Sequence, residues 1–184
     1  MAAPGLASWW GGAATAGLIT RKNRLQPGRL KPKPRYFNTI AGIFDIVPSM
    51  GMTEQTLSSI LGAARVIAVV GASPNPGRPS HQVARYLIEH GFDVVPVRPK
   101  VKEILGRKCY GSLEEIPVRV DIVDVFRKPE ACPDVARSAV AVGANVLWLQ
   151  EGIISEEAAR IAREGGLEVV MDACIKKVHQ QLKI

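Results

Sequence analysis

The sequence predicts an α/β fold, with a doubly wound parallel sheet of five strands in the order 3-2-1-4-5. Two observations predict this class. Apolar, β-branched runs alternate with helical patterns from residue 52 onward, and such alternation gives a parallel sheet that helices cover on both faces. The first apolar run, residues 66–70, leads through a glycine turn straight into a helix. Since strand–helix–strand crossovers are right-handed, a doubly wound sheet is the simplest arrangement.

Each element follows from a local pattern. A leading helix places Leu57, Ile60 and Leu61 on one face, and the helix after the first strand ends at Gly91, which suits the position after a helix. Strands are expected over residues 65–73, 92–99, 120–127, 145–152 and 167–172, and helices over residues 54–64, 79–91, 130–144, 155–166 and 173–184. Together they predict a Rossmann-like domain over residues 52–184.

The positive charge is concentrated in the first part of the chain. The formal net charge is +7, but residues 1–51 hold seven bases and one acid, whereas residues 52–184 hold 17 bases and 16 acids. The predicted domain is therefore nearly neutral, which argues against nucleic acid as a partner. The three cysteines form no C-x-x-C pair, which argues against a zinc site or disulfide framework and favours the cytoplasm. No apolar run reaches 18 residues, so we expect no membrane-spanning segment.

Residues 1–51 show neither a helical nor a strand period, and they include the basic, proline-rich run "RKNRLQPGRLKPKPRYF". We expect either a disordered N-terminal extension or a start codon placed too early, because "MTE" at residue 52 would be a natural beginning. An organelle transit peptide would be similarly basic, but it should form an amphipathic helix. An arm that binds nucleic acid or a membrane surface is a further alternative.

In doubly wound sheets, ligands bind beyond the carboxyl ends of the strands. The turn after the first strand is "GASPNPGRPS". Gly71 lets the backbone come close to a ligand, and Ser73 offers a hydroxyl. Pro79 suits the first turn of the following helix, and Arg78 and Ser80 lie beside its free N–H groups. A helix N-terminus attracts anions, so this turn predicts a phosphate site; a plain tight turn is the alternative.

The loop after the second strand separates the cofactor classes best. Domains that bind NAD carry an acid here, which holds the ribose hydroxyls. This chain has Arg98 and Lys100 instead. Cations favour a phosphate on the ribose, as in NADP or coenzyme A (CoA). Two solvated charges on an edge loop are the alternative.

The remaining strands end in weaker signals. Phe126 either stacks on an adenine or is the last core residue of its strand, and Arg127 beside it suits a phosphate. Gly152, in "LQEGI", permits close backbone approach to a ligand. Cys174, with an aspartate and a histidine nearby in sequence, allows a nucleophilic site to be imagined, although buried cysteine is usually inert. His81 and His90 are expected at the surface.

Several motifs in order resemble the small CoA-binding domain proteins: "VVGAS-P-RPS", "VPV-PK", "G-KCY-SLEEIP", "VDVFR", "LWLQEGI-SEEAA" and "VVMD-CIK--H". These proteins look like a free-standing form of the first domain of the succinyl-CoA synthetase alpha subunit. The resemblance covers roughly residues 54–182. It departs from the family at Arg98, where asparagine is more common, and at Ala173, where arginine is common.

The resemblance implies a CoA site around the ends of three strands. It places these residues at the phosphates: Gly71, Ala72, Ser73, Arg78 and Ser80. It places these around the adenosine: Arg98, Lys100, Phe126 and Arg127. Gln150 and Gly152 would line the path of the pantetheine arm. The synthetase carries its phosphorylated histidine outside this first domain, so the resemblance implies binding without ligase chemistry.

Two functions therefore stay open. The first is a module that binds CoA or an acyl-CoA, and the second is an enzyme that is NADP-linked or handles acyl-CoA through Cys174. A nucleic-acid-binding protein that uses its basic N-terminus is a more remote alternative. The alanine-rich stretch "VARSAVAVGA" is compatible with packing inside the domain or with a homodimer.

Overall fold

The computed structural model describes residues 52–183. Its main sheet has five parallel strands: β1 (Val66–Val70), β2 (Asp93–Val97), β5 (Ile122–Val125), β6 (Val146–Leu149) and β7 (Glu168–Val170). The helices are α1 (Glu54–Ala63), α2 (Pro79–Glu89), α3 (Cys132–Ala141), which follows a short 3₁₀ turn (Pro129–Ala131), α4 (Glu156–Glu164) and α5 (Ile175–Leu182). The α/β class and the five-stranded parallel sheet are confirmed. The prediction for residues 1–51 lies outside the described residues.

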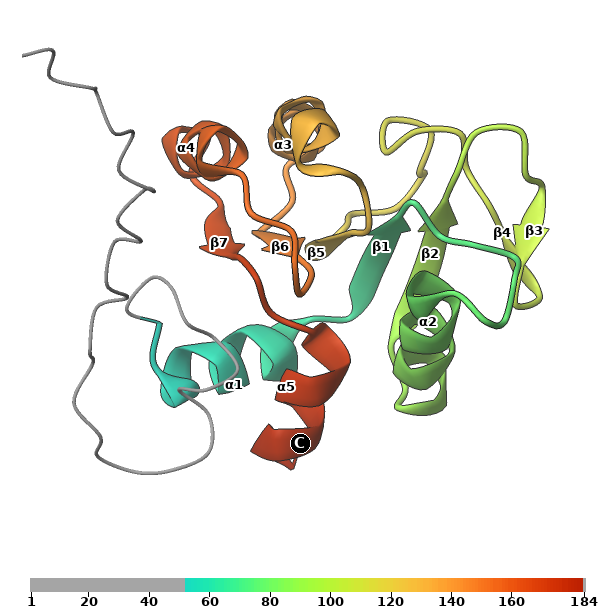
Figure 1. Cartoon of the computed structure of the whole chain (residues 1–184), viewed down its shortest axis with the longest axis horizontal. Coiled ribbons are helices and arrows are strands. Elements are labelled where there is room, and N and C mark those ends of the chain that lie inside the picture. Colours follow the sequence, from blue (N-terminus) through green and yellow to red (C-terminus); the bar gives the residue numbers. More distant parts are fainter. Residues whose placement is uncertain (1–51, 184) are drawn as a thin grey trace, which may run out of the picture. The chain divides into compact units, whose positions relative to one another are not determined.

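The helices form a layer on each face of the sheet (Figure 1). Helices α1, α2 and α5 lie on one side, and α3 and α4 lie on the other. The core follows this division, because alternate residues of each strand point to opposite faces. Ile67, Ile122 and Trp148 belong to the apolar cluster under α1, α2 and α5, whereas Val123 and Leu147 belong to the cluster under α3 and α4.

The predicted strand order 3-2-1-4-5 is wrong. The observed order is β2-β1-β5-β6-β7, so the third long strand pairs with the first and the second strand lies at the edge. Pro96 lies within β2 and has no N–H to donate, so it belongs at an edge. Its carbonyl oxygen accepts a hydrogen bond from Tyr110 N at 3.0 Å, in a single bridge beyond the edge of the sheet.

The segment between β2 and β5 contains a small hairpin rather than a crossover helix. Its strands are β3 (Glu103–Ile104) and β4 (Arg107–Lys108), which pair in antiparallel fashion. Leu105 and Gly106 both have positive φ angles, of 54° and 71°, as a two-residue hairpin turn of the primed type requires. This hairpin was not predicted. Among the described helices, none is long and apolar enough to cross a membrane.

Local capping explains where several helices begin. The Thr53 hydroxyl accepts a hydrogen bond from Thr56 N at the start of α1, and Ser155 accepts one from Ala158 N at the start of α4. Helix α2 begins at Pro79, whose fixed φ suits the first helical position. Gly91 follows α2 with φ of +86°, as predicted.

Asp121 holds the first, third and fourth long strands together at their amino ends. Its Oδ2 accepts hydrogen bonds from Arg65 N at 2.8 Å and Val66 N at 2.9 Å. Its carbonyl oxygen accepts from Asn145 N and Val146 N, both at 3.0 Å. The carboxylate therefore fixes β5 beside β1, which is the pairing that the predicted order lacked.

We predict that Asp121→Ala destabilises the domain by about 1–3 kcal/mol, because two backbone N–H groups lose their acceptor. Urea unfolding of the variant and the unmodified chain measures the difference. Asp93→Ala is the matched control, since Asp93 also lies at the start of a strand but its carboxylate pairs with the Arg107 side chain at the surface. That change should cost less than about 1 kcal/mol. Equal losses in the two variants would contradict this role of Asp121.

Candidate ligand-binding site

Gly71 lies where the carboxyl ends of three strands converge. Its N–H donates to Val97 O at 3.0 Å, and Phe126 N donates to Val70 O at 2.8 Å. Gly71 has φ of +87°, and a Cβ atom at this position would lie 2.6 Å from Phe126 O. No side chain fits there without moving backbone, so the sheet edge is bare at the point where a ligand would cross it.

The turn that follows is shaped by its own side chains. Ala72 is fully buried and Ser73 is 9% exposed. Ser73 Oγ accepts a hydrogen bond from Asn75 N at 3.2 Å, and Asn75 Oδ1 accepts one from Gly77 N at 2.8 Å. The Ser73 hydroxyl keeps its own hydrogen for donation. The turn is thus held in shape before any ligand arrives.

Helix α2 directly follows this turn; Pro79 has no N–H and the N–H groups of His81 and Gln82 donate to Arg78 O, so in the first turn the Ser80 N–H is left as a donor. Arg78 is the N-cap residue and makes no capping bond with its side chain, which is exposed. Ser80 is 5% exposed. The first N–H groups of a helix have no acceptor within the helix, and its dipole makes this end attractive to anions. Ser73, Arg78 and Ser80 therefore lie around one helix end, and phosphate binding by them stays a prediction.

His81 corrects one prediction. It was expected at the surface, but it is 8% exposed, and its Nδ1 lies 2.8 Å from Ser73 O. The ring fills the space between the turn and the first turn of α2, and the carbonyl gives its nitrogen a partner. His90, at the other end of α2, is exposed as expected.

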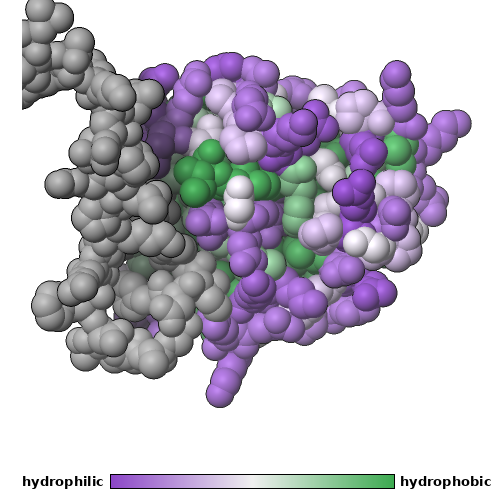
Figure 2. Space-filling model, viewed as in Figure 1, coloured by the Kyte–Doolittle hydropathy of each residue, from purple (hydrophilic) through white to green (hydrophobic). Residues whose placement is uncertain are grey.

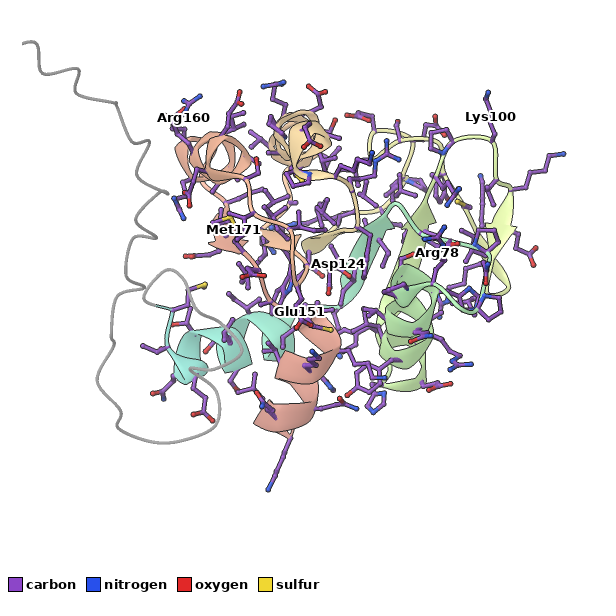
Figure 3. All side chains as sticks on the ribbon, viewed as in Figure 1. Arg78, Lys100, Asp124, Glu151, Arg160 and Met171 are labelled. Atoms are coloured by element: carbon purple, nitrogen blue, oxygen red, sulfur yellow. The ribbon has the colours of Figure 1, made fainter. Side chains whose placement is uncertain are left out.

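Two arginines lie beside this turn, on loops that follow β2 and β5. Arg98 follows β2, and its Nη1 donates to Ala72 O at 3.1 Å, which ties its side chain to the turn. Lys100 is exposed and has φ of 66°. Arg127, after β5, is also exposed. Figure 3 shows Arg78 and Lys100 on the β2 side of the molecule, where Figure 2 shows a predominantly hydrophilic surface.

A cavity of about 240 Å³ opens next to Gly71 on the α3 side of the sheet. It is smaller than a typical pocket for a drug-sized ligand, roughly 300–1,000 Å³, and so suits one ring system rather than a whole nucleotide. Of the predicted residues, Gly71 and Arg127 line it. The others that line it are Val70, Val97, Pro99, Gly111, Ser112, Leu113, Glu114, Ala131, Asp134, Val135 and Ser138.

Sequence reasoning missed the far wall of this cavity. Glu114 provides a carboxylate there, and hydrogen bonds from the Ser138 hydroxyl, its own backbone N–H and the Ser112 hydroxyl hold its pKa below the usual range. The loop sequence "GSLEE" could have indicated a polar ligand-binding loop, because small and acidic residues follow the strand-like "KCY". Without the position of α3, however, nothing in the sequence places Ser138 opposite that loop.

Phe126 lies between its two predicted roles. It is partly buried and packs against the apolar cluster under α1, α2 and α5. Its carbonyl oxygen faces Gly71, but its ring does not line the cavity. The ring therefore lies just after the end of β5, against this cluster and outside the cavity.

The predicted residues after β6 belong to another part of the edge. Gln150 is 3% exposed and does not line the cavity. Its Nε2 donates to Asp124 Oδ1 at 2.6 Å. Gly152 has φ of +81°, and its N–H donates to Asp172 Oδ1 at 2.7 Å.

The remote alternative of a nucleophilic site formed by Cys174, an aspartate and a histidine receives no support. Cys174 is the N-cap residue of α5. His179 lies on the same helix, but its Nδ1 lies 2.9 Å from the Tyr86 hydroxyl, and its ring contacts Phe92. Within residues 52–183, no hydrogen bond joins His179 to Cys174. The imidazole is part of the packing between α5 and α2.

Comparisons with known proteins identify the family and support the fold. The family model described as "CoA binding domain" matches residues 65–180. The chain is 42% identical over 131 residues to the uncharacterized protein YneT of Bacillus subtilis, covering 71% of this chain and 97% of that one. A solved structure of a hypothetical protein from Pyrococcus horikoshii has a TM-score of 0.71 and 42% identity, covering 73% of this chain and 94% of that one.

The same domain occurs within much longer enzymes. An ADP-forming acetate–CoA ligase of Archaeoglobus fulgidus is 30% identical over 128 residues, which are 64% of this chain but 19% of the ligase. The apo structure of an acetyl-coenzyme A synthetase from Ca. Korarchaeum cryptofilum matches with a TM-score of 0.57 and 26% identity, covering 62% of this chain and 28% of that one. By its matched domain, this chain belongs to the CoA binding domain family.

Proposed function

We propose that this chain binds CoA or an acyl-CoA as a binding module without ligase activity of its own. The observation that carries the proposal is that Gly71 both lines the cavity and begins the turn toward the amino end of α2. The cavity, which suits a ring, and the amino end of α2, which suits an anion, therefore meet at Gly71, which has no side chain to separate them. A molecule with a ring at one end and phosphates beside it matches that layout.

The adenine ring suits the cavity between α3 and the loop 111–114. Val70, Val97 and Leu113 provide apolar walls, and the cavity suits one ring system such as a purine. Glu114 and Asp134 give the wall acceptors, which suit the exocyclic amino group of adenine because it is a hydrogen-bond donor. In this proposal Phe126 supports the site through its backbone rather than by stacking.

The phosphates suit the opposite side of Gly71. The Ser80 N–H and the Ser73 and Ser80 hydroxyls are donors there, and Arg78, Arg98 and Lys100 supply positive charge, while Arg127 lines the cavity and lies next to Gly71. A cation in place of an acid after β2 suits a phosphorylated ribose. The pantetheine arm would continue past Gly71 toward Gln150 and Gly152.

An NADP-linked or acyl-CoA-handling enzyme is the second candidate. One observation favours NADP, since Arg98 and Lys100 would accept a 2′-phosphate as readily as the 3′-phosphate of CoA. We propose the cytoplasm as the compartment, because the cysteines of the described residues are all free thiols. A homodimer and a relation to the succinyl-CoA synthetase alpha subunit stay predictions.

We predict that CoA raises the melting temperature of the full chain, whereas NAD does not. A ligand at about 100 times its Kd adds roughly 2.7 kcal/mol to stability, which corresponds to several degrees. Differential scanning fluorimetry with CoA, acetyl-CoA, NADP and NAD separates the candidates. A rise with NADP and none with CoA would favour the second candidate.

We predict that Arg98→Glu weakens CoA binding by about 1.5–3 kcal/mol, because a charge-assisted hydrogen bond is lost and a carboxylate faces the phosphates. Isothermal titration calorimetry measures the Kd. Arg160→Glu is the matched control: it changes the net charge equally, but Arg160 lies on α4 and pairs with Glu164. An equal loss of CoA affinity in the two variants would mean that the net charge of the protein, and not a contact with Arg98, weakens binding.

We predict that Ser138→Phe blocks the adenine site and weakens CoA binding by at least about tenfold, or roughly 1.4 kcal/mol. The phenyl ring would occupy the cavity that Ser138 lines. Ala141→Phe, at an exposed position one turn further along α3, is the control and should bind CoA normally. If CoA binds the Ser138 variant with unchanged affinity, the adenine lies elsewhere.

A further inference from the structure

Asp124 is a fully buried acid in the middle of an apolar strand. Its exposed fraction is 0%, and the rest of β5 is Ile122, Val123 and Val125. Across the sheet it is paired with Val69 of β1 and Trp148 of β6. Burying an unpaired charge is costly, so an acid at this position calls for a physical explanation. The ligand-binding residues proposed above give it no role.

The Asp124 carboxyl group has one partner where it could have several. Oδ1 accepts the hydrogen bond from Gln150 Nε2, and Oδ2 has no hydrogen-bond partner among the described residues. Burial raises the pKa of Asp124 to about 7, although the Gln150 hydrogen bond opposes the rise. Both the protonated and the ionised forms are therefore populated near neutral pH.

Two histidines on the neighbouring helices, His81 and His179, have other partners. Ile122, two residues earlier in β5, belongs to the cluster under α1, α2 and α5, so Asp124 faces that side. On α2, His81 bonds with the Ser73 carbonyl. On α5, His179 bonds with Tyr86. No described residue forms an ion pair with Asp124, which leaves burial and Gln150 as the influences on it.

Gln150 connects this acid to the carboxyl edge of the sheet. It directly follows β6 and begins a turn in which Ile153 N donates to Gln150 O at 2.9 Å. The next residue, Glu151, forms an ion pair with Lys177 of α5 at 2.6 Å, and Gly152 N donates to Asp172. Figure 3 shows Asp124 and Glu151 near the centre of the molecule, above α5. On the β5 side, this turn is held by the Gln150 side chain, which bonds with Asp124, and by the Gln150 N–H, which donates to Val125 O at 3.4 Å.

We propose that Asp124 is a positioning residue, which sets the turn 150–153 against the arm of bound CoA through Gln150, and that ligand binding is coupled to proton uptake at Asp124. This inference rests on the proposed CoA function. The sign of the coupling follows from charge. A bound polyanion makes the ionised carboxylate less favourable, so the complex favours protonated Asp124. Affinity therefore falls as the pH rises through neutrality.

The first test compares the full chain with Asp124→Asn, which keeps an acceptor oxygen for Gln150 but does not titrate. Isothermal titration calorimetry gives the Kd for CoA between pH 6 and pH 8.5. The unmodified protein should lose affinity over this range by up to about tenfold more than the variant, as a one-unit pKa shift on binding would give. The ribose phosphate of CoA itself titrates near pH 6, but it does so equally with both proteins.

The second test asks whether Asp124 acts through Gln150. Gln150→Leu should weaken CoA binding and remove most of the additional pH dependence. Adding Asp124→Asn to it should then change the Kd little further, as expected for residues that act through one contact. Parallel pH profiles for the unmodified protein and Asp124→Asn, with additive losses in the double variant, would overturn the inference.

A third measurement needs no ligand and confirms that the variant folds. The native pKa of Asp124 lies above its unfolded value, near 3.9, so its contribution to stability is present at low pH and is lost as the pH rises from about 4 to about 7. Asp124→Asn should therefore melt several degrees above the unmodified protein at pH 8 and less so at pH 5. The same melting difference at both pH values would contradict the titration of Asp124.

If the unmodified chain binds no CoA, the proposed function fails and this inference fails with it.

Discussion

The structure depends on the close approach of Gly71 to the carbonyl oxygen of Phe126. A Cβ atom at residue 71 would lie 2.6 Å from that oxygen, so the direct pairing of β1 with β5 and the absence of a side chain at residue 71 require each other. The pairing places the switch point of the sheet, where the order of the strands reverses, between β1 and β5. Parallel α/β sheets bind ligands at such a point. The bare backbone joins the cavity on the α3 side to the amino end of α2.

The strand order illustrates what the sequence contained and what it did not. Alternating patterns predicted every long strand and every α-helix of the described residues. Their order depended on one residue whose signal was overlooked. Pro96, in the middle of the second strand, argues for an edge, which excludes an order with that strand between two others. The hairpin of β3 and β4 is too short to produce a period, although Leu105 and Gly106 form its turn.

The candidate site divides in the same way. Residues that directly follow a strand were predicted, because parallel topology brings such residues to one edge whatever the strand order. Gly71, Arg98 and Arg127 are examples, and Arg98 reaches the carbonyl of Ala72. The cavity wall at Glu114 and Ser138 was not predicted, since it depends on how an irregular loop lies against α3. Gln150 was predicted to line the ligand path, and its place there stays a proposal, because its amide group bonds with Asp124 beneath the turn.

Asp124 shows why a buried polar group can favour function over stability. An apolar residue at this position would match Ile122 and would avoid an oxygen without a partner, so the acid lowers the stability of the ligand-free domain at neutral pH. It also gives Gln150 a single acceptor within a sheet that is otherwise apolar on that face. A leucine or valine could fill the space, but it could not hold the amide group in one orientation. The turn after β6 would then keep the ion pair of Glu151, the N–H bond of Gly152 and the backbone bond from Gln150 N to Val125 O, which is long at 3.4 Å. An exposed ion pair contributes little to stability, so the buried hydrogen bond is the stronger constraint on the orientation of that turn.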